Sequence, residues 1–218
     1  MSQVNEQALR SGALALGLSL SDVQVRQLLD YQGMILKWNK VYNLTAVRDP
    51  SDMLTHHLLD SLAAVPPLQL HLGSLGTNGS ALLDVGSGAG LPGVVFAICL
   101  PQLRVTCVDT VGKKAAFIRQ AALTLKLDNL TGLHARVESV ADKFDVVCSR
   151  AFASLADFTA WSSAALKEEG VWMALKGKHP LDELSALPPS VELFHVEQLQ
   201  VPGLEAERCV LWLRRRSA

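Results

Sequence analysis

A glycine-rich turn at the end of an apolar segment constrains this chain more than any other feature. Residues 82–93 read LLDVGSGAGLPG, so strand-forming residues lead directly into four glycines, Gly86, Gly88, Gly90 and Gly93. Glycine adopts positive φ freely and lets a ligand approach the backbone, and Pro92 suits the first turn of a following helix. Backbone N–H groups at such a helix start favour an anion or a carboxylate. The segment therefore predicts a strand, a ligand-binding turn and a helix.

The spacing of the glycines admits two kinds of nucleotide turn. Gly88, Gly90 and Gly93 fit the GxGxxG spacing of dinucleotide folds, but in that motif the first glycine directly follows the strand. Gly86 holds that place here, and the register counted from it fails because position 91 is leucine. With Asp84 two residues before Gly86, the segment resembles the loop of S-adenosylmethionine-dependent methyltransferases. A tight turn that binds no ligand is the remaining alternative.

Short apolar segments and helical segments alternate after residue 80. Strands are predicted near 81–85, 104–109, 130–134, 144–149 and 170–175, and helices near 92–100, 112–126 and 155–166. This alternation predicts a mostly parallel sheet with helices on both faces. The segments 191–200 and 208–214 break the pattern and predict a C-terminal antiparallel hairpin.

The first part of the chain predicts helices instead. Ser21 followed by Asp22 is typical of a helix start, and a second helix begins near Pro50 and is expected to end at Pro66 and Pro67. The segment 71–80 is rich in glycine, serine and asparagine and predicts a linker. We therefore expect an N-terminal helical cap over residues 1–70 and an α/β domain over 81–218.

Side chains at successive strand ends predict where a ligand binds. Asp109 ends the second strand, and an acidic group there can accept hydrogen bonds from ribose hydroxyls. Val137 and Glu138 follow the third strand, and Arg150 follows the fourth. In an open α/β sheet the ligand binds outside the carboxyl ends of the strands, so these residues should face one crevice. The alternatives are a solvated turn for Asp109, a helix cap for Glu138 and a surface charge for Arg150.

Composition limits the partners and the compartment. Lys and Arg total 20 and Asp and Glu total 21, so any polyanion must bind to a local patch. The four cysteines form no CxxC pair and predict buried reduced thiols, and no metal-ligand spacing is found. The N-terminus lacks the pattern of a secretory signal, and no apolar run is long enough to cross a membrane. We therefore expect a cytoplasmic protein without a metal or a membrane partner.

Motifs spread along the chain point to one family. They are WNKVYNLTAV, HHLLDSL, DVGSGAGLPG, VDTVGKK, SRAFASL, ALKG and QVPGLEAER. Together they resemble the bacterial glucose-inhibited division protein B family, the guanine-N7 methyltransferases of 16S ribosomal RNA. The resemblance implies a class I methyltransferase fold, which is α/β and Rossmann-like, with a C-terminal antiparallel hairpin and added N-terminal helices. It also implies S-adenosylmethionine as donor and 16S ribosomal RNA as substrate, within the small subunit or an assembly intermediate, and we expect a monomer.

The resemblance and the strand-end argument together give the predicted site. The family's donor contacts correspond to Gly86, Leu91, Val137, Glu138 and Arg150. With the turn and strand-end residues added, the predicted donor site comprises Asp84, Gly86, Gly88, Gly90, Leu91, Asp109, Val137, Glu138 and Arg150. Arg150 and Lys176, which follows the fifth strand, are the predicted catalytic residues. Guanine N7 carries no proton, so no general base is required and catalysis can depend on positioning and electrostatics.

Several other residues have two interpretations. Lys37, Lys40 and Arg48, interleaved with Trp38 and Tyr42, form either an RNA-binding surface or an amphipathic helix with snorkelling lysines.

Four further side chains complete the candidates. Phe152 is either a base-stacking residue or part of the core, and His57 is expected to be structural. His56 and Asp60 are spaced for a pair on a helix surface. The rival functions are an oxidoreductase that uses NAD and a non-catalytic RNA-binding assembly factor.

Overall fold

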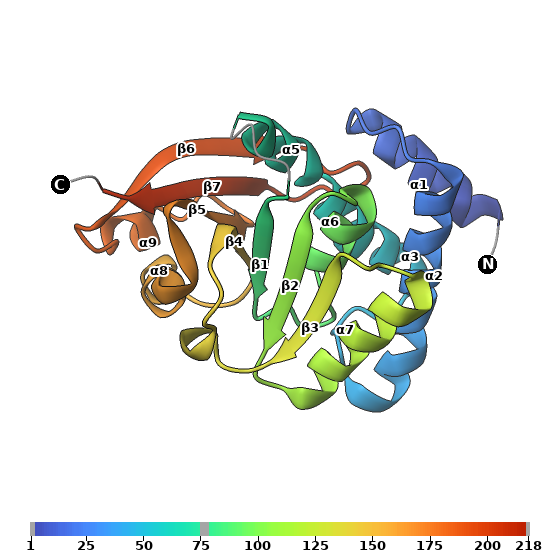
Figure 1. Ribbon diagram of the computed structural model, residues 1–218. Helices are drawn as coiled ribbons and strands as arrows, with labels where there is room; N and C mark the ends of the chain where they lie inside the picture. The colour runs from blue at the N-terminus through green and yellow to red at the C-terminus, as the bar shows by residue number, and fades with distance from the viewer. Residues whose placement is uncertain (1–2, 75–78, 217–218) are drawn as a thin grey trace.

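The computed structural model describes residues 3–74 and 79–216. Its centre is a seven-stranded sheet in the order β3-β2-β1-β4-β5-β7-β6 (Figure 1). The first five strands run parallel, and β7 pairs antiparallel with both β5 and β6. The strands are β1 (Ala81–Val85), β2 (Arg104–Asp109), β3 (Leu130–His134), β4 (Phe144–Arg150), β5 (Leu166–Lys176), β6 (Val191–Leu199) and β7 (Arg208–Arg215). The predicted parallel sheet and terminal hairpin are confirmed, and β5 begins earlier than its predicted start at residue 170.

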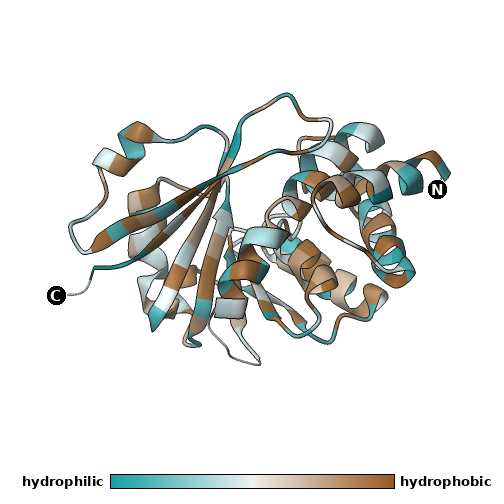
Figure 2. Cartoon of the chain, turned by 90° about the horizontal axis from the view of Figure 1, so that it is seen from above, coloured by the Kyte–Doolittle hydropathy of each residue, from teal (hydrophilic) through white to brown (hydrophobic). Residues whose placement is uncertain are grey.

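Helices cover both faces of this sheet. On one face lie α6 (Gly93–Cys99) and α7 (Gly112–Leu125), and on the other lies α8 (Leu155–Ser162) with the 3₁₀ turns η2 (Val137–Ser139) and η3 (Ser163–Ala165). A short helix, α9 (Leu181–Ser185), joins β5 to β6. Successive strand residues alternate between the two faces, so Leu82 packs toward α6 while Leu83 packs toward α8. Figure 2 shows apolar residues along the central strands and also on the helices beside them.

The N-terminal helices pack against the face that carries α6 and α7. They are α1 (Gln3–Ala15), α2 (Asp22–Tyr42), α3 (Pro50–Met53), the π-helical η1 (Leu54–Leu59), α4 (Asp60–Leu62) and α5 (Val65–Ser74). The predicted start at Ser21 is confirmed, because its Oγ accepts from the Gln24 N–H at 3.2 Å and the Gln24 side chain accepts from the Ser21 N–H at 2.9 Å.

The helical segment that begins at Pro50 ends at Leu62, shortly before its predicted end at Pro66 and Pro67. Both prolines lie in the first turn of α5, where their missing N–H groups are not needed for helical hydrogen bonds. Helix α5 continues to Ser74, so the first part of the predicted linker 71–80 is helical. Residues 75–78 of that linker lie outside the described residues.

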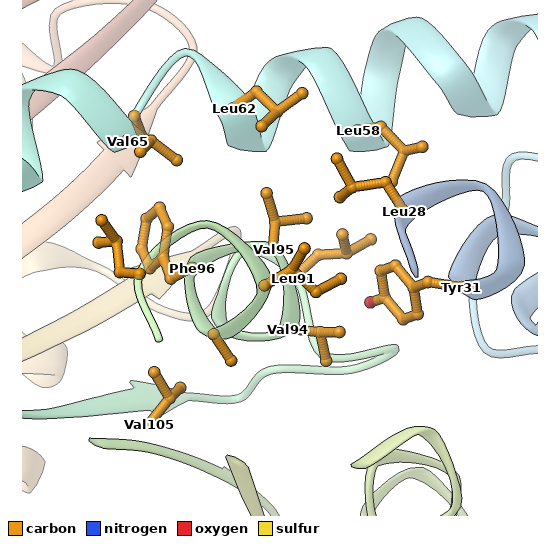
Figure 3. Close-up of a cluster of buried hydrophobic side chains, with 14 of the residues drawn as sticks. Leu28, Tyr31, Leu58, Leu62, Val65, Leu91, Val94, Val95, Phe96 and Val105 are labelled. Carbon is orange, nitrogen blue, oxygen red and sulfur yellow. The ribbon is translucent and has the colours of Figure 1, made fainter. Parts of the chain in front are cut away.

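The cap and the sheet share one hydrophobic core. Figure 3 shows Leu58, Leu62 and Val65 of the cap facing α6, with Val105 of β2 on the opposite side of that helix. Leu58, Leu62 and Phe96 of α6 are fully buried. The helical cap therefore adds its apolar residues to the same core that the sheet uses, and the boundary between residues 70 and 81 stays a prediction.

Candidate functional site

Two adjoining cavities open at the carboxyl ends of the parallel strands. The cap cavity, of about 600 Å³, lies between the cap segments Leu44–Val47 and His56–Asp60 and the ends of β1, β4, β5 and β7. The strand-end cavity, of about 480 Å³, lies outside β1, β2 and η2. Gly86, Lys114 and Ala151 line both cavities. The shared residues make the two cavities neighbours, and volumes of this size suit small ligands, so together they form the candidate site.

The glycine turn separates the two cavities. Gly86, Gly88 and Gly90 have φ values of 65°, 59° and 89°, a backbone conformation that favours glycine. Gly86 and Gly88 line the cap cavity together with Leu91. Gly90 lines neither cavity, because it packs against the helix: a Cβ there would lie 2.5 Å from Val94 Cγ2.

Asp84 lies beneath this turn rather than in either cavity. Its side chain is fully buried, and Oδ2 accepts a hydrogen bond from the Gly93 N–H at 2.9 Å. That bond joins the end of β1 to the start of α6. The structure thus places this predicted donor contact outside both cavities, where it supports the turn.

The surroundings of Asp84 perturb its titration. Burial raises the pKa of its carboxyl group to about 7, although the Gly93 N–H and the Arg150 charge act in the opposite direction. Asp84 lies in register between Cys107 of β2 and Cys148 of β4, and Cys107 Sγ is 3.9 Å from Oδ2. Burial raises the pKa of both thiols as well. These two cysteines are buried and free, as predicted, and Cys148 belongs to the core.

Asp109 joins the two turns that border the strand-end cavity. Its Oδ2 accepts from the Gly88 N–H at 3.0 Å, and its Oδ1 accepts from the Val111 N–H at 2.8 Å. Lys114 Nζ lies 3.8 Å from Oδ2. Each carboxylate oxygen has a second lone pair, so Asp109 can still accept hydrogen bonds from a ligand. Val137 and exposed Glu138 line the same cavity, as expected for strand-end residues.

Aromatic side chains form the other wall of the strand-end cavity. Phe152 lies so close to Gly86 that a Cβ at position 86 would be 2.2 Å from its ring. Its ring centroid is 6.5 Å from that of Phe158 in the core and 5.9 Å from that of Trp161. Phe152 packs against the core, which is one of its two predicted roles, and it also lines the strand-end cavity. Base stacking by Phe152 stays a prediction. Trp161, which is 43% exposed, carries no sequence signal that singled it out.

A buried carboxylate organises the cap cavity. Asp60 is 4% exposed and accepts hydrogen bonds from two arginines, Arg150 Nη1 to Oδ2 at 2.7 Å and Arg208 Nε to Oδ1 at 2.6 Å. Arg150 Nη1 also donates to the His56 carbonyl at 3.1 Å. The predicted surface pair of His56 and Asp60 is therefore wrong, because Asp60 faces the sheet while His56 Nδ1 contacts the carbonyl of Asp52.

His57 holds the cap segment that walls this cavity. Its Nε2 lies 2.7 Å from Thr45 Oγ1 and its Nδ1 lies 3.0 Å from the His56 carbonyl. Since that carbonyl can only accept, Nδ1 carries the proton and Thr45 donates to Nε2. Burial and the nearby Arg150 charge lower the pKa of His57, so the ring is neutral at pH 7. The predicted structural role of His57 is confirmed.

The predicted basic groups differ in how they are placed. Lys176 lines the cap cavity, but its Nζ donates to both carboxylate oxygens of Glu183 at 2.8 and 2.9 Å. Trp38 packs against Phe117, and Lys113 lies over the Tyr42 ring with Nζ 5.3 Å from its centroid. The structure therefore brings Arg150 and Lys176 to the cavity and leaves the cluster around Trp38 outside it.

Metal ligands and membrane-spanning helices are two other features that bear on function. Among the described residues, no group of three potential ligands is placed to hold a metal ion. No helix in that part of the chain is long and apolar enough to cross a membrane.

Comparisons with known proteins agree with this architecture. The family model of rRNA small subunit methyltransferase G matches residues 24–211. A ribosomal RNA small subunit methyltransferase G of Polaromonas sp. strain JS666 is 71% identical over 214 residues, covering 98% of this chain and 95% of that protein.

Solved structures share the fold at low sequence identity. A Burkholderia thailandensis 1,6-didemethyltoxoflavin-N1-methyltransferase with bound S-adenosylhomocysteine has a TM-score of 0.58 and 17% identity, covering 87% of this chain and 90% of that one. A Thermus thermophilus 16S rRNA N2 methyltransferase with AdoMet and guanosine has a TM-score of 0.54 and 20% identity, covering 72% and 43%. These likenesses show the class I methyltransferase fold, and the family match shows that this chain belongs to the rRNA small subunit methyltransferase G family.

Proposed function

We propose that the protein transfers a methyl group from S-adenosylmethionine to N7 of a guanosine in 16S ribosomal RNA of the small ribosomal subunit. One observation carries this proposal: a glycine turn built for close ligand approach separates two neighbouring cavities. One cavity then holds the nucleoside part of the donor and the other receives the acceptor base. The names of the 71% identical relative and of the family model supply the class of substrate.

The residues present fit the donor. Gly88 has no atom within 4 Å of an added Cβ, so the backbone there is open to a ligand. Asp109 keeps lone pairs that ribose hydroxyls can use, and Val137 and Phe152 offer apolar surfaces for an adenine ring. The residues that would hold the donor are Gly86, Gly88, Leu91, Asp109, Val137, Glu138 and Arg150. Asp84 and Gly90 would instead support the turn through their contacts with the start of α6.

The chain's part in the reaction is positioning. The donor supplies an electrophilic methyl group bound to positively charged sulfur. Guanine N7 has a lone pair and no proton, so the chain has no proton to remove before the transfer. Arg150, fixed by Asp60 and the His56 carbonyl, presents its remaining N–H groups at the junction of donor and acceptor. The transfer moves the positive charge from sulfur to the guanine, so the chain need not supply a further charge at N7. Lys176, held in place by Glu183, would contact an RNA phosphate near the acceptor.

The decisive experiment is methyl transfer to small subunits that lack this modification. Labelled S-adenosylmethionine is supplied, the RNA is digested with nuclease and the labelled nucleoside is identified. Labelled 7-methylguanosine at one site establishes the reaction. Binding of S-adenosylhomocysteine without any label would support the non-catalytic alternative, and binding of NAD would support the oxidoreductase.

The form of the substrate belongs to the same proposal. The chain has a net charge of −1, so RNA binding should depend on a shaped target more than on many phosphate contacts. We expect small subunits or assembly intermediates to be methylated faster than protein-free 16S RNA, and equal rates would contradict this. We also propose that the protein acts as a monomer, and action on ribosomal RNA supports a place in the cytoplasm.

A further inference from the structure

Asp60, Arg150 and Arg208 come from three distant parts of the chain and meet at one wall of the cap cavity. Asp60 begins α4, Arg150 ends β4 and Arg208 begins β7. Both oxygens of Asp60 are used, one by each arginine. Arg208 also donates through Nη1 to the Glu207 carbonyl at 2.8 Å. A buried carboxylate therefore fixes the planes of two guanidinium groups.

Part of each guanidinium group remains available. The side chains of Arg150 and Arg208 are 19% and 25% exposed, and both residues line the cap cavity. Nε and Nη2 of Arg150 and Nη2 of Arg208 have no acceptor among the residues that the structure describes. Since guanidinium N–H groups bind carboxylate or phosphate oxygens in fixed directions, these free donors suit an anion that enters the cavity.

The charge of the cavity wall points the same way. Lys114, Arg150, Lys176 and Arg208 line the cavity, whereas Asp60 is the one acidic side chain in its lining. Glu183, which lies outside the lining, balances Lys176. The wall therefore keeps an excess of positive charge, and low exposure strengthens its attraction for an anion.

The position of Arg208 separates it from the donor. In the sheet order, β4 and β5 lie between β1, which carries the glycine turn, and β7, which carries Arg208. Strands are spaced about 4.8 Å apart, so Arg208 starts about 14 Å from the turn, whereas Arg150 lies on the strand next to it. Arg208 thus belongs to the acceptor side of the cavity.

We propose that Arg208, oriented by Asp60, binds a phosphodiester group of the RNA chain beside the target guanosine. In this arrangement Asp60 is a positioning residue for both arginines. The inference rests on the proposed function, because it takes the cap cavity as the entry of an RNA nucleotide. It adds to that function a specific contact that places the nucleotide before transfer.

The test compares Arg208→Gln with Arg214→Gln. Arg214 lies on the same strand, is 55% exposed in its side chain, pairs with Glu192 and lines neither cavity, so its replacement is a matched loss of charge. The assays are calorimetric binding of S-adenosylhomocysteine, and KM and kcat for undermethylated small subunits at saturating donor. For Arg208→Gln we expect KM to rise by about tenfold or more, as for a lost charge-assisted hydrogen bond, with S-adenosylhomocysteine binding unchanged. For Arg214→Gln we expect no change in either.

Direct RNA binding separates failure of this inference from failure of the proposed function. In the presence of S-adenosylhomocysteine, loss of one phosphate contact should reduce the slope of log K for small-subunit binding against log salt by about 1. If wild-type protein forms 7-methylguanosine but Arg208→Gln changes neither KM nor this slope, the phosphate contact is overturned while the function stands. If wild-type protein transfers no methyl group, the function itself fails.

Two variants protect the test against unfolding. Arg208→Lys keeps a positive charge for Asp60 but lacks the rigid fork, so it should fold like wild type and still raise KM. Asp60→Asn should raise KM while keeping both arginines, because their orientation is lost. A normal KM in Asp60→Asn would contradict the positioning role of Asp60, and a normal KM in Arg208→Lys would contradict the contact through the guanidinium fork.

Discussion

Gly86 meets two independent constraints at one residue. Its φ of 65° costs about 1–2 kcal/mol for a residue with a Cβ, and such a Cβ would lie 2.2 Å from the Phe152 ring. The sequence alone predicted the positive φ from the strand-turn pattern. It did not predict the contact with Phe152, because that contact depends on β1 and β4 being neighbours in the sheet, and no local pattern gives the order of the strands.

We expect Gly86→Val to abolish binding of S-adenosylhomocysteine while the fold is largely kept. The added side chain pushes Phe152 toward the strand-end cavity and strains the turn that both cavities share. Calorimetry measures the binding, and circular dichroism measures the fold. Gly33→Ala is the control, since nothing lies within 4 Å of its Cβ and the helical substitution should stabilise by about 0.5–1 kcal/mol. Micromolar binding by Gly86→Val would argue against the assigned loop.

Asp84 predicts a pH dependence of stability. Its pKa is about 7 in the folded protein and lies near 3.8 when the chain is unfolded. Between these two pKa values the folded state binds a proton that the unfolded state does not. The free energy of unfolding therefore falls as pH rises from about 4 to 7, and this group causes no further change above pH 7. Asp84→Asn can keep the acceptor for the Gly93 N–H and removes the titration. In urea unfolding at pH 5 and pH 8, the variant should gain stability relative to wild type at the higher pH. An equal difference at both pH values would contradict the raised pKa.

At the scale of elements, helix α2 braces the glycine turn from the cap. Tyr31 is fully buried, and its hydroxyl donates to the Ala89 carbonyl at 2.6 Å. In Figure 3 its ring points toward Leu91 and Val94. The turn is therefore supported by Asp84 from the sheet and by Tyr31 from the cap.

We expect Tyr31→Phe to weaken both stability and donor binding. The change leaves a buried carbonyl without its partner, which costs about 1–3 kcal/mol, and it loosens residues that line the cap cavity. Tyr42→Phe is the matched control, because Tyr42 is 42% exposed and donates no hydrogen bond to another described residue. Chemical unfolding and S-adenosylhomocysteine affinity are the measurements. A normal affinity in Tyr31→Phe would show that the turn holds its shape without the cap.

The elements also show what the sequence could predict. Strand and helix positions in 81–215 followed from local patterns, because burial on two faces and turn residues are visible within a few positions. The glycine turn, Asp109, Val137, Glu138 and Arg150 followed from the rule that parallel strands end at one edge. The pairing of Asp60 with Arg208 did not, since 148 positions separate them and no local period joins them. For the same reason His56 and Asp60 were misread as a surface pair.

On the scale of the whole molecule, the cap and the sheet should unfold together. Leu62 of the cap and Phe96 of α6 are fully buried in one hydrophobic cluster that also includes Val105 of β2. Two separate transitions would require each part to keep its apolar face covered alone, and the shared core does not allow that.

Leu62→Ala tests this coupling. Removing this side chain from the core costs about 2–5 kcal/mol, and the loss should lower the unfolding midpoint of the cap and the sheet equally. Trp38 reports on the cap and Trp172 on the sheet, so variants that retain one tryptophan each follow the two parts by fluorescence. Leu14→Ala is the control, because Leu14 is exposed and its replacement should change stability by no more than about 0.5 kcal/mol. If only the unfolding midpoint reported by Trp38 shifted, residues 1–70 would be an independent folding unit. If the midpoints of both tryptophans shifted together, the cap wall of the cap cavity and the glycine turn would depend on the same hydrophobic core. One packing arrangement would then shape both the cap cavity and the strand-end cavity.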